Sequence, residues 1–213
     1  MKEQFIELLK NTNREGIGSL ITFLDKTDFY TAPASTKFHN SFEGGLLAHS
    51  LNVRKALKQL VGDQWSDDTI TIVALLHDIC KINMYKVEYR NKKDETGTWV
   101  KEPFYMIDDM MPLGHGEKSV MLISEFIKLS KEELYAIRWH MGGFEPKENH
   151  NYVSKTYEKY PLAVYMHMAD IMATYILGYN ICTKFRLLSV PRRMRKRKRK
   201  KLNLFRYRLP CRN

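Results

Sequence analysis

The sequence predicts an all-α protein, a mainly helical bundle, with one inserted β-hairpin. Most of the chain repeats apolar residues at the three- and four-residue spacing of helices. Residues 84–107 depart from that spacing, because they alternate, are rich in aromatic and β-branched side chains, and are divided by the turn-forming residues 93–97. A chain of 213 residues has room for one sizeable domain with its own core.

Before the hairpin, helices are expected at residues 2–11, 17–24 and 44–61, and from Ser66 onward. Ser66 is the expected N-cap of the last of these helices, with two aspartates in its first turn. His49 and His77 fall on the apolar faces of their helices, so both should point inward. Residues 28–40 contain a proline and several Ser and Thr, and are expected to form a loop leading to His39.

After the hairpin, helices are expected at residues 117–129, 131–141 and 157–178. Ser130 and Glu133 have the spacing of a capping box, which marks the start of the second of these helices. Residues 141–155 hold two glycines, a proline and mostly polar side chains, so a loop is expected there.

The charge pattern divides the chain. The net charge is +11, but residues 183–213 hold 14 of the 35 Lys and Arg residues and none of the 24 acidic ones, so the first 182 residues carry −3. We expect N-terminal helices at 1–35 packed on a core domain at 36–182, followed by a basic, disordered tail at 183–213. Within the tail, Arg192–Lys201 has nine basic residues in ten. It could be a nucleic-acid arm, a contact for acidic membranes or an incidental extension, and the change in composition also permits an altered reading frame.

The cysteines and the apolar pattern bear on location. Cys80, Cys182 and Cys211 are odd in number and widely spaced, which favours a reduced, cytoplasmic protein. No apolar run approaches the roughly 18 residues of a transmembrane segment. The first helix carries acidic residues within its apolar pattern and does not resemble a signal peptide.

One stretch carries the strongest chemical signal. Residues 73–76 are apolar and lead directly into His77 and Asp78, an imidazole and a carboxylate that together can flank a metal ion. A buried aspartate is costly unless it is paired or coordinates a metal, and its two oxygens could bridge a second ion. Four further candidate ligands lie elsewhere in the chain: His49, His115, His140 and Asp170.

Each candidate also has an ordinary structural explanation. A histidine on an apolar helix face is often a hydrogen-bonded core residue, His115 could be a turn residue, and His140 could favour a helix C-terminus. Asp170 is harder to explain, because it lies in a nearly apolar helix with no Lys or Arg within one turn. Any one of these six residues could point inward without binding a metal. For five of the six to do so at once would be a much larger coincidence. Imidazole and carboxylate ligands suit Mn, Fe, Co, Ni or Zn.

These residues resemble the HD-domain superfamily of metal-dependent phosphohydrolases. The segment His77-Asp78-Ile79-Cys80-Lys81 resembles the HDxGK signature of that superfamily, with Cys80 in place of Gly. Residues 38–50 are similar to the segment before the first ligand in bacterial HD-domain 3′–5′ exoribonucleases, and residues 165–170 resemble their HLAD-type helix. The resemblance covers residues 36–178 and is specific, because six ligand positions occur in order.

Carried onto this chain, the resemblance implies two divalent transition-metal ions, most readily Mn, Fe, Co or Ni, with Mg or Zn as further possibilities. Four residues would hold the first ion: His49, His77, Asp78 and Asp170. His115 and His140 would hold the second ion, with Asp78 as the bridge. Two such ions can activate a bridging water and clamp both oxygens of an in-line displacement at phosphorus.

Asp78 and Lys81 are the residues expected to act in catalysis, and His39, Lys81 and Arg138 those expected to contact substrate. Lys81 could neutralise a phosphate oxygen or could be a cation at a helix end. His39 could touch the phosphate or protonate the leaving group, or be a solvated loop residue. Arg138 could instead lie on the surface. His167 is suited to hydrogen-bond a metal ligand.

The leading functional hypothesis is a metal-dependent phosphohydrolase, a phosphomonoesterase or phosphodiesterase, acting on nucleotides or short oligonucleotides. A di-iron HD-fold oxygenase with the same ligands is an alternative. Another is a nucleic-acid-binding protein acting through Arg192–Lys201, whose binding would weaken steeply with salt. Aromatic residues of the hairpin and of residues 141–155 could stack on a base or could simply cover one face of the ribbon.

Overall fold

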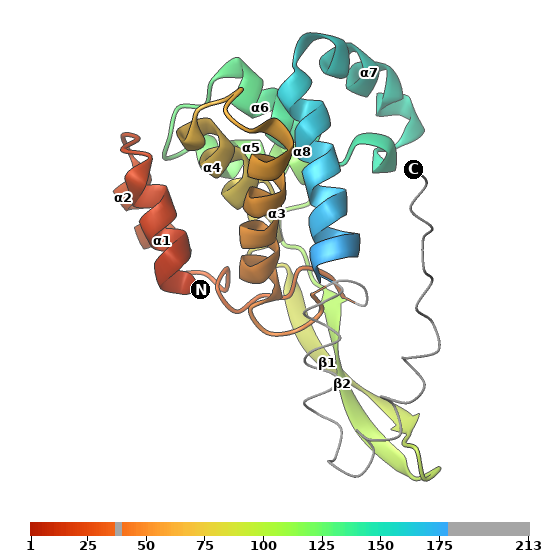
Figure 1. Cartoon of the computed structure of the whole chain (residues 1–213). Helices are drawn as coiled ribbons and strands as arrows, with labels where there is room; N and C mark the ends of the chain where they lie inside the picture. The colour runs from red at the N-terminus through yellow and green to blue at the C-terminus, as the bar shows by residue number, and fades with distance from the viewer. Residues whose placement is uncertain (37–39, 179–213) are drawn as a thin grey trace, which may run out of the picture.

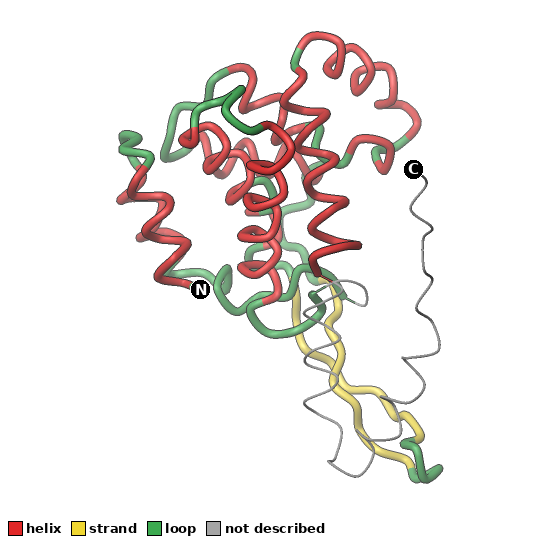
Figure 2. The backbone as a smooth tube through the Cα atoms, in the orientation of Figure 1, coloured by secondary structure: helices red, strands yellow, loops and turns green. Residues whose placement is uncertain are grey.

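A computed structural model describes residues 1–36 and 40–178, and most of them are helical (Figures 1 and 2). The helices are α1 (Lys2–Asn11), α2 (Ile17–Leu24), α3 (Gly45–Val61), α4 (Asp67–Leu76), α5 (His115–Ser124), α6 (Lys131–Arg138), α7 (His150–Lys159) and α8 (Pro161–Met172). Short 3₁₀ turns lie at Ile79–Lys81, Gly142–Phe144 and Lys147–Asn149, and a π-helical segment, Ala173–Leu177, continues α8. The predicted fold class is confirmed. None of the helices in these residues is long and apolar enough to cross a membrane.

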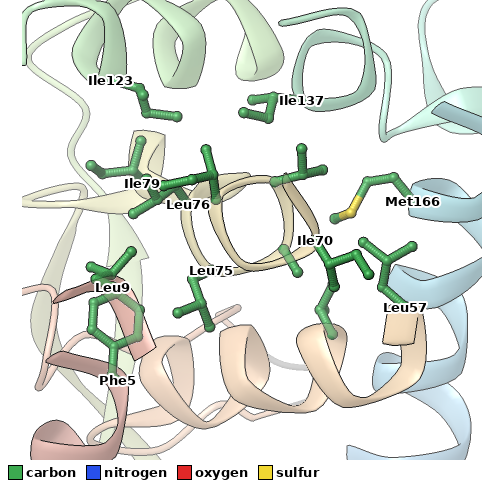
Figure 3. Packing of buried hydrophobic residues seen from close by; sticks show 14 of the residues in the cluster. Phe5, Leu9, Leu57, Ile70, Leu75, Leu76, Ile79, Ile123, Ile137 and Met166 are labelled. Carbon is green, nitrogen blue, oxygen red and sulfur yellow. The ribbon is translucent and has the colours of Figure 1, made fainter. Parts of the chain in front are cut away.

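Helix α4 lies at the centre of the hydrophobic core. Every residue from Ile70 to Leu76 is buried. Figure 3 looks along α4, with Leu75 between it and α3, and with Ile137 and Met166 on its other sides. A helix that is apolar all round is buried on every side, so the residues that follow α4 are delivered to the interior. At its other end the Ser66 hydroxyl accepts a hydrogen bond from the Thr69 N–H, as the predicted N-cap requires.

The predicted hairpin is an antiparallel ribbon of β1 (Tyr85–Lys93) and β2 (Trp99–Ile107). It projects from the helical body as a long arm, whose base lies near the start of α3 (Figure 1). The Asp94 carboxylate closes the turn by accepting hydrogen bonds from the Thr96 and Thr98 N–H groups. The arm therefore begins at the helical body and ends in solvent.

Four predicted elements are wrong at their boundaries. The predicted helices 117–129 and 131–141 end earlier, at Ser124 and Arg138. The predicted helix 157–178 is two helices, because Pro161 lacks the N–H that a continuous helix needs and instead begins α8. Tyr160, between the two helices, has the non-helical angles φ −132° and ψ 80°. The predicted loop 141–155 contains the first half of α7, which begins at His150. The stripe formed by Val153 and Thr156 is buried and accounts for that helix.

A buried ion pair ties the N-terminal helices to the body. Arg14, in the α1–α2 connection, donates to both carboxylate oxygens of Glu133, at 2.5 and 3.1 Å. Glu133 is fully buried and also accepts a hydrogen bond from the Thr69 hydroxyl. It closes the predicted capping box with Ser130. Burial raises the pKa of Glu133, but the Arg14 guanidinium outweighs burial and holds that pKa below its ordinary value.

Candidate metal centre

The end of α4 places two candidate ligands in the interior. His77 follows Leu76 as the C-cap residue, and its Nδ1 lies 2.9 Å from the Ala74 carbonyl oxygen. A carbonyl can only accept, so Nδ1 carries the proton and Nε2 presents a lone pair. Asp78 then leaves the helical conformation and directs its carboxylate into the same space, where it is almost fully buried.

The end of α6 repeats this arrangement with His140. Its Nδ1 lies 2.7 Å from the Ile137 carbonyl oxygen, which again leaves the lone pair on Nε2. His77 and His140 are fully buried, and among the described residues neither Nε2 has a hydrogen-bond partner. Two buried, unpartnered lone pairs oriented by backbone carbonyls are the donors that a divalent cation requires. The residues present therefore fit a metal site.

Helix α5 supplies His115 as its first residue, slightly earlier than the predicted helix start. The His115 Nε2 lies 2.8 Å from the Asp78 Oδ1 atom. Gly116 packs so closely on the Arg138 carbonyl that a Cβ atom there would overlap it. This close approach of α5 to the end of α6 brings the rings of His115 and His140 to 5.1 Å between centroids.

Asp170 finds its partner on α3. His49 Nε2 lies 3.1 Å from the Asp170 Oδ1 and 3.6 Å from the Asp78 Oδ2. Burial raises the pKa of Asp170, but its contact with His49 outweighs burial and holds the pKa below its ordinary range. The Asp170 carboxylate, which has no Lys or Arg within one turn of its own helix, is therefore paired with His49 of α3.

The two oxygens of Asp78 face different histidines. Oδ2 lies 3.4 Å from the His77 Nε2 and 3.6 Å from the His49 Nε2. Oδ1 lies 2.8 Å from the His115 Nε2 and 3.6 Å from the His140 Nε2. One carboxylate therefore divides the histidines into two pairs. The potential ligand atoms fall into three overlapping groups, each within 4.8 Å, that together contain all six predicted ligands: His49, His77, Asp78, His115, His140 and Asp170.

Lys81 is the cation nearest to this centre among the described contacts of Asp78. Its Nζ donates to the Asp78 Oδ2 at 2.6 Å. Burial raises the pKa of Asp78, but the Lys81 charge, with the surrounding imidazoles, outweighs burial and holds that pKa well below its usual range. Asp78 therefore stays ionised, as a metal ligand must.

Cys80, which stands where the signature has Gly, packs against a ligand ring. Its Sγ lies 3.4 and 3.7 Å from the two ring nitrogens of His115. Burial, followed by the Asp78 charge, raises the pKa of the Cys80 thiol to about 12. The thiol stays protonated and acts as a small buried residue.

The other predicted site residues have different surroundings. Arg138 forms ion pairs with Glu117 and with Glu145, the latter at 3.1 Å, and its guanidinium lies 3.6 Å from the Trp139 ring centroid. His167 hydrogen-bonds through Nδ1 to the His140 backbone carbonyl, at 2.7 Å, rather than to a ligand ring. His39 lies outside the described residues. The ion pair between Lys81 and Asp78 was not predicted from the sequence. The only indication of it was that the two residues are three positions apart, a spacing at which side chains can meet.

Two of the six predicted ligands are partly exposed to solvent. The side chains of His115 and Asp170 are 26% and 20% exposed, whereas the other four predicted ligands are at most 3% exposed. Among the described residues, His115 and Asp170 are therefore the predicted ligands that solvent, or a substrate, can reach most readily.

Comparison with known proteins points to one family. The HD domain model matches residues 46–175, more than half of the chain. Over 117 residues the chain is 30% identical to a dihydroneopterin 2′,3′-cyclic phosphate phosphodiesterase of Methanocaldococcus jannaschii. That match covers 52% of this chain and 43% of the relative, so the chain spans less than half of the length of this relative. No solved structure matches the chain.

Proposed function

The chain belongs to the HD-domain family, and from this premise we propose that it is a phosphohydrolase with a dinuclear centre of divalent cations. His49, His77, Asp78 and Asp170 would hold one ion, and Asp78, His115 and His140 the other. The observation that carries the assignment is the division of the Asp78 oxygens between two pairs of histidines. The oriented lone pairs of His77 and His140 support it.

The proposed chemistry is hydrolysis of a phosphoester. When bound, two cations supply an activated water and charge stabilisation at phosphorus. The imidazoles and carboxylates would hold those cations, and four of the six ligands are buried away from bulk water. The relative from M. jannaschii is named as a phosphodiesterase of a cyclic phosphate, which supports phosphodiester hydrolysis of a phosphorylated small molecule. Nucleotides or short oligonucleotides are the substrates that we propose.

The proposed domain division remains N-terminal helices at 1–35, an HD domain at 36–182 and a basic tail at 183–213. The tail lies outside the described residues, so a nucleic-acid contact through Arg192–Lys201 stays a prediction. The widely spaced cysteines support a cytoplasmic enzyme.

The test of this proposal is metal analysis of the purified protein, followed by hydrolysis assays of p-nitrophenyl phosphate and bis(p-nitrophenyl) phosphate with Mn²⁺, Co²⁺ and Mg²⁺. We expect two equivalents of a transition metal, loss of activity on chelation and recovery on adding Mn²⁺ or Co²⁺. Preference for the diester would support the phosphodiesterase. A coloured protein that consumes oxygen and hydrolyses neither ester would contradict the proposal and favour a di-iron oxygenase.

Lys81 is proposed to act on substrate rather than on the cations. Its ammonium pairs with Asp78 Oδ2, so cation binding at that oxygen would release it toward a phosphate. We expect Lys81→Gln to keep full metal content while lowering kcat/KM about 100-fold, the usual effect of removing one group that stabilises developing charge. Metal analysis and steady-state kinetics measure both quantities.

The matched control for Lys81 is Lys86→Gln, because Lys86 pairs with exposed carboxylates at the base of the arm. It should leave both quantities unchanged. Loss of metal from Lys81→Gln would show instead that Lys81 only maintains the structure of the centre.

A further inference from the structure

The arm formed by β1 and β2 is a long element that projects from the helical body (Figures 1 and 2). At about 3.3 Å per residue, the nine residues of each strand give the arm a length of about 30 Å. The arm joins the chain close to site residues, because β1 begins four residues after Lys81 and β2 ends eight residues before His115. At the root, the Tyr85 hydroxyl donates to the Ala34 carbonyl, at 3.4 Å.

The two faces of the arm differ in charge. Side chains alternate along each strand, and the register places ten residues on one face, here called the aromatic face: Tyr85, Val87, Tyr89, Asn91, Lys93, Trp99, Lys101, Pro103, Tyr105 and Ile107. None of these ten is acidic, and Lys93 and Lys101 are its only charged residues. The carboxylates of both strands lie on the opposite face, where Glu102 pairs with Arg90 and Lys92, each at 2.7 Å.

The aromatic face is also the more exposed in large apolar side chains. Tyr89 and Trp99 are each 66% exposed, and Val87 and Ile107 are more than half exposed. Lys93 Nζ lies 5.1 Å from the Trp99 ring centroid, so cation and ring are already adjacent. Exposed aromatic rings lie among cations that pair with no carboxylate in the described part of the chain, and such surfaces bind single-stranded nucleic acid by stacking on bases and neutralising phosphates.

We propose that the aromatic face binds a single-stranded oligonucleotide and leads it to the metal centre. Tyr89 and Trp99 would stack on bases, and Lys93 and Lys101 would contact phosphates. The role as a substrate track rests on the proposed phosphohydrolase function. A second copy of this chain is a poorer occupant of the face, because symmetric packing would bring Lys93 and Lys101 of both copies together without a carboxylate to pair with them.

The experiment measures binding of a fluorescent oligothymidylate of about ten nucleotides to the full chain by anisotropy, with EDTA present so that no cleavage occurs. Tyr89→Ala combined with Trp99→Ala should weaken binding about 10- to 100-fold. Lys93→Gln combined with Lys101→Gln should reduce the slope of log K against log salt by about 1.4. The basic tail is the same in every variant, so a difference between variants reports on the arm.

The control changes the same charge on the opposite face. Lys86→Gln combined with Lys92→Gln should leave the binding constant and its salt slope near the parent values. If both double lysine variants lost the same amount of oligonucleotide affinity, binding would depend on net charge and not on the aromatic face. That result would overturn the proposal. Unchanged binding by the aromatic variant would also overturn it, and a fall in molar mass of that variant, measured by light scattering, would assign the face to self-association.

Small-ester hydrolysis separates this inference from the proposed function. All of these variants should hydrolyse bis(p-nitrophenyl) phosphate like the parent protein once loaded with metal, because the aromatic face does not contribute to the cluster. Arm-dependent oligonucleotide binding by a parent protein that hydrolyses no ester would contradict the proposed function and leave the binding face supported.

Discussion

Asp78→Asn is expected to lower kcat/KM for a phosphodiester by about 10⁴-fold and to remove bound metal at the same time. Asparagine keeps the shape of the side chain and can still accept a hydrogen bond from Lys81, so the fold should persist. In Asp78 each carboxylate oxygen faces a pair of histidines. The asparagine has no negative charge and only one acceptor oxygen. Metal analysis and kinetics on one preparation test both effects.

The control for Asp78→Asn is Asp63→Asn, whose side chain is fully exposed. It should retain metal and turnover. An Asp78→Asn protein with two equivalents of metal and normal turnover would contradict the proposed centre. Circular dichroism and thermal melting of both variants would separate a loss of metal from a loss of structure.

Glu133→Gln is expected to lower the free energy of unfolding by about 3 kcal/mol at neutral pH, because Arg14 and the Thr69 hydroxyl lose their charged partner in a buried position. The folded-state pKa of Glu133 lies below the ordinary value of 4.5. Its stabilising contribution is therefore complete above pH 4.5 and is lost as pH falls through the lower, folded-state pKa. Urea unfolding across pH measures this dependence.

The parent protein and the variant should accordingly differ most at neutral pH and converge in acid. Glu132→Gln removes a partly exposed carboxylate from the same helix turn and serves as the control, with an expected change within about 0.5 kcal/mol. A Glu133→Gln protein as stable as the parent at pH 7 would show that Arg14 does not anchor the N-terminal helices through this contact.

The predictable parts of the fold are those whose local structure is determined by residues that are close together in the sequence. The Ser66 cap, the Ser130 capping box and the alternation of the hairpin each depend on residues within a few positions, and each is found in the structure. The break at Pro161 also had a local signal, since proline starts helices more readily than it continues them. The apolar residues that follow it hid the boundary.

The site divides in the same way. The type of each candidate ligand was evident from the chain, and the burial of His77 followed from the apolar run before it. Their meeting was not evident, because it depends on how α3, α5, α6 and α8 pack around the end of α4. The contact between Gly116 and the Arg138 carbonyl sets one of those approaches, and sequence spacing cannot show which distant segments will touch. The substrate contact of His39 and the role of the basic tail remain predictions, because both lie outside the described residues.

The position of Asp78 between two pairs of histidines has a thermodynamic consequence. If each oxygen serves one cation, the two binding equilibria share a single group and cannot be independent. Whatever factor the first cation applies to the affinity of the second, the second must apply to the first. Isothermal titration with metal should therefore show that binding at one site changes the affinity of the other. A change confined to one pair of imidazoles should alter the affinity measured at the other pair.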